Sequence, residues 1–149
     1  MMTLQLFSML IAAQVVVSSP PAASRGPAPQ QVAAPAADAV EIVVFSDFQC
    51  PFCAAFSAPF RVVQKHGIDG VKTTVRFKHF PLPIHSKAQL AHQAAVAAGR
   101  QGKFWEMHDL LFANQRRAER NDILGYARKL KLNTARFLKD LNSPEVRRI

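Results

Sequence analysis

The chain has 149 residues, 49% of them hydrophobic, which is enough for one domain with a buried core and too few for a second domain. Lysine and arginine outnumber aspartate and glutamate by 19 to 10, a net charge of +9. The cationic residues of the C-terminal half alternate with apolar ones, so we interpret them as solvated helix faces. Attraction to an anionic lipid surface is the alternative. Nucleic-acid binding is a poor fit to an exported protein, and the N-terminal residues described next indicate export.

The first 39 residues differ in composition from the rest. Residues 4–17 form an apolar stretch, short for a membrane-spanning helix and about right for a signal peptide, although no basic residue precedes it. We predict a signal peptide or N-terminal anchor over residues 1–24, with a misassigned start as the alternative. Residues 25–39, rich in Pro and Ala, are predicted to be a disordered linker, because they cannot bury enough apolar surface to offset the ordering entropy. We therefore predict a periplasmic or otherwise exported protein, which is tethered to the membrane if the first segment stays attached.

A strand, a helix and a second strand are predicted next. The apolar, β-branched run over residues 40–44 predicts a buried strand, and the helix follows over residues 52–66. Pro59 is expected to interrupt and kink this helix, and Gly67 to end it. Alternation over residues 71–80 predicts a strand that is open to solvent on one side and parallel to the first. The predicted apolar face of the helix holds Phe52, Phe56, Phe60 and Val63.

Helical periodicity then predicts four helices and the start of a fifth. The first, over residues 86–100, carries a face of alanines that lets a neighbouring helix approach closely. The second covers residues 103–114, with Phe104, Met107 and Leu111 pointing inward. The predicted N-cap residues are Ser86 for the first helix, Asn121 or Asp122 for the third and Asn133 for the fourth. Residues 143–145 are predicted to begin the fifth helix.

The only two cysteines, Cys50 and Cys53, lie where the first strand ends and the first helix begins. The unpaired N–H groups and partial positive charge of a helix N-terminus stabilise an anion, so a thiolate is favoured at Cys50. Pro51 suits the first helical turn because it has no N–H to leave unpaired. A disulfide between the two sulfurs could be opened through a mixed disulfide at Cys50, with Cys53 one turn away to resolve it. The pattern predicts thiol–disulfide exchange.

A lone Cys-x-x-Cys has two other interpretations, an inert structural bridge and half of a zinc site. Zinc would need two further ligands, and the candidates His66, His79 and His85 come with no second Cys-x-x-Cys. A metal-binding chaperone is therefore a third interpretation of the chain. We predict no metal and no cofactor.

Three segments resemble, in the same order, the DsbA-like thioredoxin-fold oxidoreductases of bacteria. They are SDFQCPFC at residues 46–53, RFKHFPLPIH at 76–85 and GKFWEMHDLLF at 102–112. The resemblance implies an α/β thioredoxin-like fold with a helical insertion, a nucleophilic Cys50 and a resolving Cys53. It implies cysteine-containing exported client proteins and a membrane redox partner that re-oxidises or reduces the pair. Oxidase, reductase and isomerase directions stay open, because Phe52 brings no charge to the pair.

The sequence also departs from this family. In its members a loop with a cis-proline that faces the cysteines, two strands and a closing helix follow the insertion, and no segment here can be assigned to them. We therefore expect residues 40–149 to be an incomplete domain, either truncated or completed by a partner chain, since a two-stranded sheet is marginal alone. Pro144 is interpreted as a helix-start proline. The alternative function is a non-catalytic remnant or interaction module of the same fold.

Residues around the cysteines carry further predictions. Many relatives place an acid six residues before the nucleophile, where this chain has Val44, so proton transfer to Cys53 is expected to use water. Asp47 is predicted to hydrogen-bond the backbone of the strand-to-helix turn. Phe48 and Phe52 flank the cysteines and could contact an unfolded client. The histidines His79, His85 and His108 are predicted to be packed and hydrogen-bonded.

Overall fold

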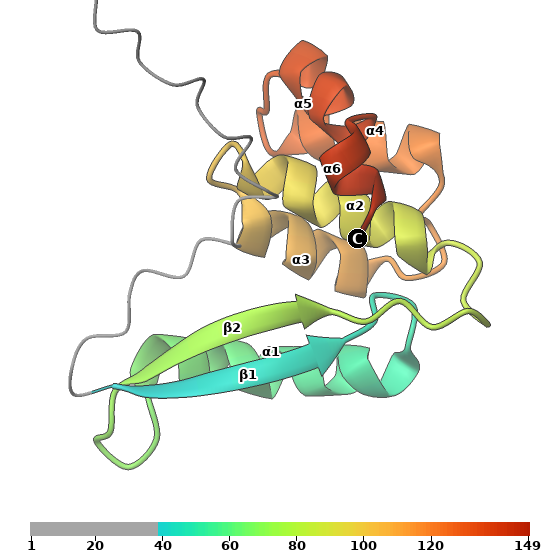
Figure 1. Ribbon diagram of the computed structural model, residues 1–149. Coiled ribbons are helices and arrows are strands. Elements are labelled where there is room, and N and C mark those ends of the chain that lie inside the picture. The colour runs from blue at the N-terminus through green and yellow to red at the C-terminus, as the bar shows by residue number, and fades with distance from the viewer. Residues whose placement is uncertain (1–38) are drawn as a thin grey trace, which may run out of the picture.

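The computed structural model describes residues 39–149. The predicted signal peptide or anchor lies outside these residues, as does the predicted linker apart from its last residue. None of the helices formed by residues 39–149 is long and apolar enough to cross a membrane. In chain order the elements are β1 (Val40–Ser46), α1 (Pro51–His66), β2 (Thr73–His79), α2 (Ala88–Gly99), α3 (Phe104–Ala113), α4 (Arg120–Lys129), α5 (Thr134–Leu141) and α6 (Pro144–Arg147) (Figure 1).

The two strands form a parallel sheet, as predicted, with Ser46 of β1 opposite His79 of β2. The helix between them, α1, lies against one face of the sheet (Figure 1). Val75 and Phe77 of β2 point to this side and are buried. The prediction that the run over residues 40–44 is buried is wrong, since Val40 and Val43 are 55% and 44% exposed. Among residues 39–149 only β2 pairs with this strand, so its other edge and outer face are left uncovered.

Helix α1 continues without a break through Pro59, so the predicted interruption is wrong. Its predicted apolar face is buried only at Phe60, whereas Phe52 and Phe56 are 83% and 60% exposed. The helix ends at Gly67 as predicted. This residue has φ +76°, and a Cβ there would lie 2.1 Å from the carbonyl oxygen of Val71. Only glycine fits this turn.

The prediction that the second strand starts at Val71 is wrong by two residues. Val71 forms an isolated antiparallel bridge with Ile68, which closes the turn after α1. The two backbone hydrogen bonds between them measure 3.0 and 2.8 Å. The chain therefore turns back on itself before Thr73, where the pairing with β1 begins.

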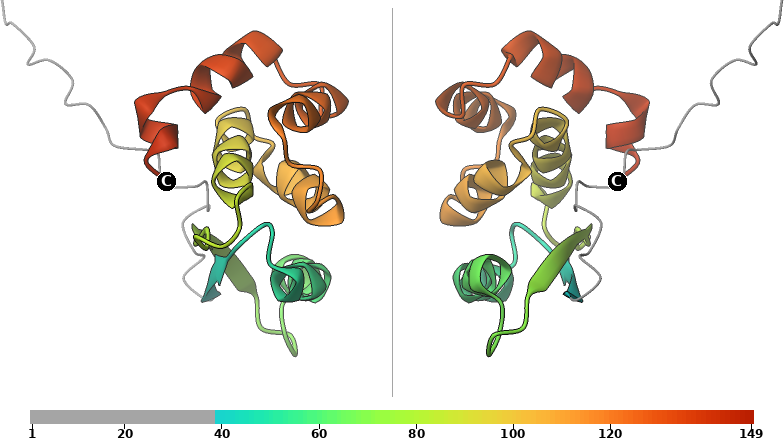
Figure 2. Two further views of the ribbon diagram at one scale, coloured as in Figure 1. Left: turned by 90° about the vertical axis from the view of Figure 1, so that its right-hand side faces the viewer. Right: turned by 90° about the vertical axis from the view of Figure 1, so that its left-hand side faces the viewer.

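Helices α2 to α6 form a second layer beside the sheet and α1 (Figure 2). Helix α2 is central and contacts α3, α4, α5 and α6. Its alanine face is fully buried, which confirms the predicted close approach of a neighbour. A Cβ on Gly99 would lie 3.3 Å from the Cβ of Phe104, so α2 and α3 pack tightly where they meet. The buried alanines are Ala88, Ala91, Ala94, Ala95, Ala97 and Ala98.

One predicted N-cap and the predicted start of the last helix are confirmed. Asn133 accepts a hydrogen bond from the backbone N–H of Arg136 at 2.9 Å. Ser143 accepts one from Val146, and Pro144 is the first residue of α6, as its neighbours predicted.

The other two predicted N-caps are wrong. Helix α2 begins only after Lys87, because residues 85–88 form a turn of their own in which Ala88 donates to the carbonyl of His85; Ser86 therefore does not cap it. Helix α4 is preceded by Glu119, which forms a reciprocal capping box with Asp122. Asp122 thus contributes from the third helical position, and not from the cap itself.

A candidate cysteine site at the start of helix α1

The two cysteines lie where the sequence places them, at the junction of β1 and α1. Cys50 is the N-cap residue with extended backbone angles, φ −72° and ψ 121°, and Pro51 is the first helical residue. The carbonyl of Cys50 accepts the first helical hydrogen bond, from the N–H of Ala54 at 3.1 Å. Cys53 follows in the first turn of the helix. Both are free thiols and half-buried, so the pair is available for exchange chemistry.

Asp47 supports the turn before Cys50 through both of its carboxylate oxygens. Oδ1 accepts a hydrogen bond from the N–H of Gln49 at 2.7 Å. Oδ2 accepts from the N–H of Leu82 at 2.7 Å and faces Nδ1 of His85 at 2.8 Å. Burial raises the pKa of Asp47, but the hydrogen bonds from Leu82, His85 and Gln49 outweigh it and hold this pKa below its ordinary value. The predicted backbone role is confirmed, and it extends to the loop after β2.

Phe48 is a core residue and does not contact solvent. Its side chain is 1% exposed and stacks on Phe77 with 5.3 Å between ring centroids. The rings of His92 and Phe112 lie 4.7 and 4.9 Å away. The prediction that Phe48 could contact a client is therefore wrong, because the turn held by Asp47 directs this side chain inward. Phe52, between the cysteines, remains exposed as that prediction requires.

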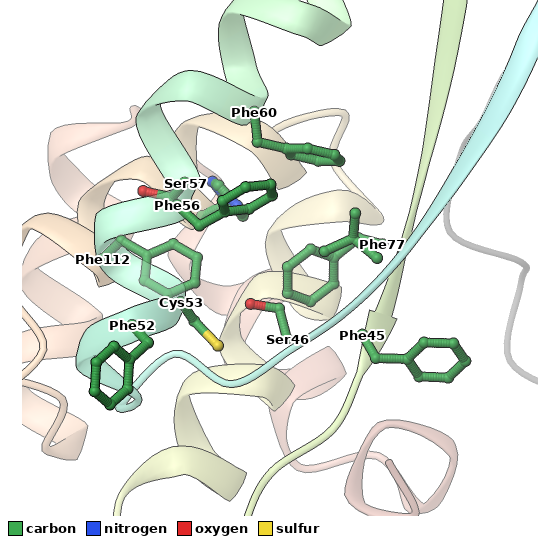
Figure 3. Close-up of a pocket in the computed structure, with 11 residues that line it drawn as sticks. Phe45, Ser46, Phe52, Cys53, Phe56, Ser57, Phe60, Phe77 and Phe112 are labelled. Carbon is green, nitrogen blue, oxygen red and sulfur yellow. The ribbon is translucent and has the colours of Figure 1, made fainter.

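A pocket of about 320 Å³ opens beside Cys53, between the end of β1 and the first turns of α1. Figure 3 shows the side chains of Cys53 and Ser46 pointing toward one another, whereas the ring of Phe45 points away. Val44 lines the same pocket, so the place of the acid found in many relatives is apolar here. Ser46 was not singled out in the sequence. The remaining lining residues are Phe52, Phe56, Ser57, Phe60, Phe77, His108 and Phe112.

A buried pair of histidines lies behind the cysteine loop. Nδ1 of His79, the last residue of β2, is 2.6 Å from Nδ1 of His92 on α2. Burial, reinforced by His92, lowers the pKa of His79 to about 3. Burial likewise lowers the pKa of His92 to about 4, although the charge of Asp47 acts in the opposite direction. Both rings are therefore neutral at pH 7, and one must donate its proton to the other.

The predicted packing of the histidines is confirmed for all three. His79 is paired as described, His85 contacts Asp47, and His108 is buried with Nδ1 2.8 Å from Oδ1 of Asp109. Burial lowers the pKa of His108 more than Asp109 raises it. His92 was missed, because a histidine among alanines on a helix gives no signal of a partner on a distant strand. In residues 39–149 no group of three or more His, Cys, Asp and Glu side chains is placed to hold a metal.

Gln115 reaches the cysteine loop from the segment between α3 and α4. Its Nε2 donates to the carbonyl of Phe48 and to the carbonyl of Cys50, both at 2.9 Å. These bonds join residues 65 or more positions apart. No feature of the sequence around Gln115 could have indicated this contact.

These observations define the class of protein. A parallel strand–helix–strand unit, with a Cys-x-x-Cys at the start of its helix and a layer of helices after it, is an α/β thioredoxin-like fold with a helical insertion. A family model described as "Thioredoxin" matches residues 31–149. The chain belongs to this family, and the resemblance to its DsbA-like members is confirmed.

Solved structures of oxidoreductases share this fold, and the curated relatives match it over a small part of their length. A thioredoxin-like oxidoreductase from Silicibacter pomeroyi DSS-3 is 26% identical with a TM-score of 0.61, over 81% of this chain and 63% of that one. The oxidoreductase DsbA from Xylella fastidiosa is 21% identical with a TM-score of 0.57, over 77% of this chain and 64% of that one. The Na(+)/H(+) antiporter NhaA 1 of Salinispora arenicola (strain CNS-205) is 42% identical over 103 residues. That match covers 68% of this chain and 15% of the antiporter.

Proposed function

We propose that the chain is a thiol–disulfide oxidoreductase in which Cys50 exchanges disulfides with exported proteins and Cys53 resolves the mixed disulfide. The observation that carries the proposal is the position of Cys50 as the N-cap of α1, with Cys53 in the first turn and both thiols free. The unpaired N–H groups at the start of a helix stabilise a nearby anion, and the thiolate is the form of a cysteine that reacts. The thioredoxin family of the chain supports the same chemistry.

The exchange can be written for the oxidising direction. A client thiolate attacks the sulfur of Cys50 in a Cys50–Cys53 disulfide, so that a client–Cys50 bond forms and Cys53 leaves as a thiolate, which takes up a proton from water. A second client thiolate then attacks the client sulfur of this mixed disulfide and releases Cys50. The client loses two electrons and two protons, and the cysteine pair gains them. Every step reverses in the reducing direction.

The surface beside the cysteines suits contact with an unfolded client. Phe52 and Phe56 expose apolar rings at the mouth of the pocket that reaches Cys53. Large exposed apolar side chains that are grouped in this way are typical of interaction sites. Pro51 stiffens the loop between the two sulfurs, and Asp47 holds the turn before it. These residues are proposed as supports of the redox loop.

The partners and the location are part of the proposal. The apolar stretch over residues 4–17 supports export to the periplasm, and a tether to the membrane if the segment is retained. A membrane redox partner would then re-oxidise or reduce the pair. Antiport is not proposed for this chain, because the segment shared with the NhaA relative is 15% of that protein.

The test is a comparison of the chain with Cys50→Ser and Cys53→Ser variants. The chain is expected to accelerate the reduction of insulin disulfides by dithiothreitol, and Cys50→Ser to abolish this activity. Cys53→Ser is expected to accumulate a mixed disulfide that gel electrophoresis without reductant detects, because Cys50 can still attack and nothing resolves the product. An unmodified chain no faster than Cys50→Ser would contradict the proposal and favour the interaction module.

A further inference from the structure

Gln115 is placed to act on the cysteine pair through the backbone of the cysteine loop. Its two hydrogen bonds end on the carbonyls of Phe48 and Cys50, which lie on either side of Gln49. The carbonyl of Cys50 also accepts the N–H of Ala54, so it has two donors. We propose that Gln115 is a positioning residue that holds Cys50 in the geometry of the dithiol form. This inference rests on the proposed function.

The segment that carries Gln115 is itself held on both sides. The side chain of Asn114 donates to the carbonyl of Leu110 at 2.8 Å. The N–H of Arg117 donates to the carbonyl of Asn114 at 2.8 Å, and the hydroxyl of Tyr126 donates to the carbonyl of Arg117 at 2.6 Å. Gln115 is therefore a fixed donor from the helical layer. Moving Cys50 relative to α1 would stretch its bonds or displace this whole segment.

The direction of the effect follows from the state of the thiols. Both cysteines are free thiols while both Gln115 bonds are formed. Closing the disulfide joins the two sulfurs and gives two electrons and two protons to an oxidant such as glutathione disulfide. On this proposal, closure also draws Cys50 away from the position in which Gln115 holds its carbonyl. Bonds that are satisfied in the dithiol therefore oppose closure. Gln115 favours the dithiol and makes the pair a stronger oxidant.

The experiment equilibrates the full chain with mixtures of reduced and oxidised glutathione and measures the dithiol fraction by alkylation and a gel shift. Gln115→Met keeps the length of the side chain and removes its donor. We expect the equilibrium to move about 5- to 10-fold toward the disulfide, since two ordinary hydrogen bonds are lost from one form. Gln115→Asn, one methylene shorter, is expected to shift it in the same direction and covers the case in which the Met variant does not fold.

Gln101 offers a matched control. Its Nε2 donates to the carbonyl of Asn133 at 3.2 Å and its Oε1 accepts the N–H of the same residue at 2.9 Å, so it also ties two segments together. It does not touch the cysteine loop, and Gln101→Met should leave the glutathione equilibrium unchanged. A chain that forms no disulfide in glutathione would contradict the proposed function. This inference alone would be overturned if the unmodified chain forms the disulfide but the equilibrium constant of the Gln115 variants lies within twofold of its value or shifts toward the dithiol.

Discussion

The helical layer and the sheet with α1 differ sharply in how completely they are buried. In the helical layer, each of helices α3 to α6 contributes at least one residue that is 0% exposed, including Met107, Ile123 and Phe137. In the other region Phe45, Phe52 and Phe56 are exposed, and a pocket reaches Cys53. The residues with the chemistry therefore lie in the thinly buried region. They are held in place by contacts to the helical layer.

Two phenylalanines on helices provide the largest expected contrast. Phe137 of α5 is 0% exposed and Phe56 of α1 is 60% exposed. Phe137→Ala should lower the free energy of unfolding by about 3–5 kcal/mol, because it leaves a cavity in a closed core. Phe56→Ala should change it by less than about 1 kcal/mol. Urea unfolding measures both, and equal losses would show that the two regions are not differently packed.

The turn after α1 is the point at which the thinly buried region should be most sensitive. Gly67→Ala should cost about 3 kcal/mol, because the backbone conformation is one that only glycine adopts readily and a Cβ would overlap the carbonyl of Val71. Gly125→Ala, in the interior of α4 with open space around it, is the matched control. It should stabilise the chain by about 0.5–1 kcal/mol. Thermal unfolding of the two variants should shift in opposite directions.

The histidine pair joins the two regions and should make the chain sensitive to acid. His79 and His92 have pKa values of about 3 and about 4 in the folded chain, against 6.5 for an ordinary histidine. As the pH drops, these histidines bind protons at a higher pH in the unfolded chain than in the folded chain. The free energy of unfolding should therefore fall as the pH drops from about 6.5 toward 4. The loss should be about 3 kcal/mol from His92 alone.

Urea unfolding at a series of pH values tests this prediction. A double variant, His79→Leu with His92→Leu, should flatten the decline below pH 6.5, because it removes both buried rings together and leaves no unpaired partner. His66→Gln, at the exposed end of α1, is the control. A double variant that declined as steeply as the parent chain would assign the acid sensitivity to other groups.

Helix caps provide the smallest expected effects. Asn133→Ala should cost about 1 kcal/mol, because the side chain satisfies the N–H of Arg136 at the start of α5. Ser86→Ala should stay within about 0.5 kcal/mol, because Ser86 does not cap α2. Differential scanning calorimetry resolves the difference if both variants are measured beside the parent. A larger loss for Ser86 would mean that the residue caps the helix in solution.

Local patterns were sufficient where one stretch of chain supplies all of the interactions. The strand-to-helix junction at Cys50, the glycine end of α1 and the caps Asn133 and Ser143 all depend on neighbours within a few residues. The buried alanine face of α2 follows from helical periodicity. Local patterns failed for β1. Its apolar residues predict burial, but burial depends on whether another element covers the strand. The prediction that Ser86 caps α2 failed because residues 85–88 form a turn of their own before the helix.

The sequence by itself determined the class of fold, the cysteine pair and its place at a helix N-terminus, because these rest on periodicity, turn preferences and short-range spacing. Only the tertiary structure decided that Phe48 is buried while Phe52 is exposed, and that His79 meets His92. It alone brings Gln115 to the carbonyl of Cys50. These contacts join residues 13 to 65 positions apart, and their geometry depends on how the helical layer packs on the sheet, which no local pattern encodes.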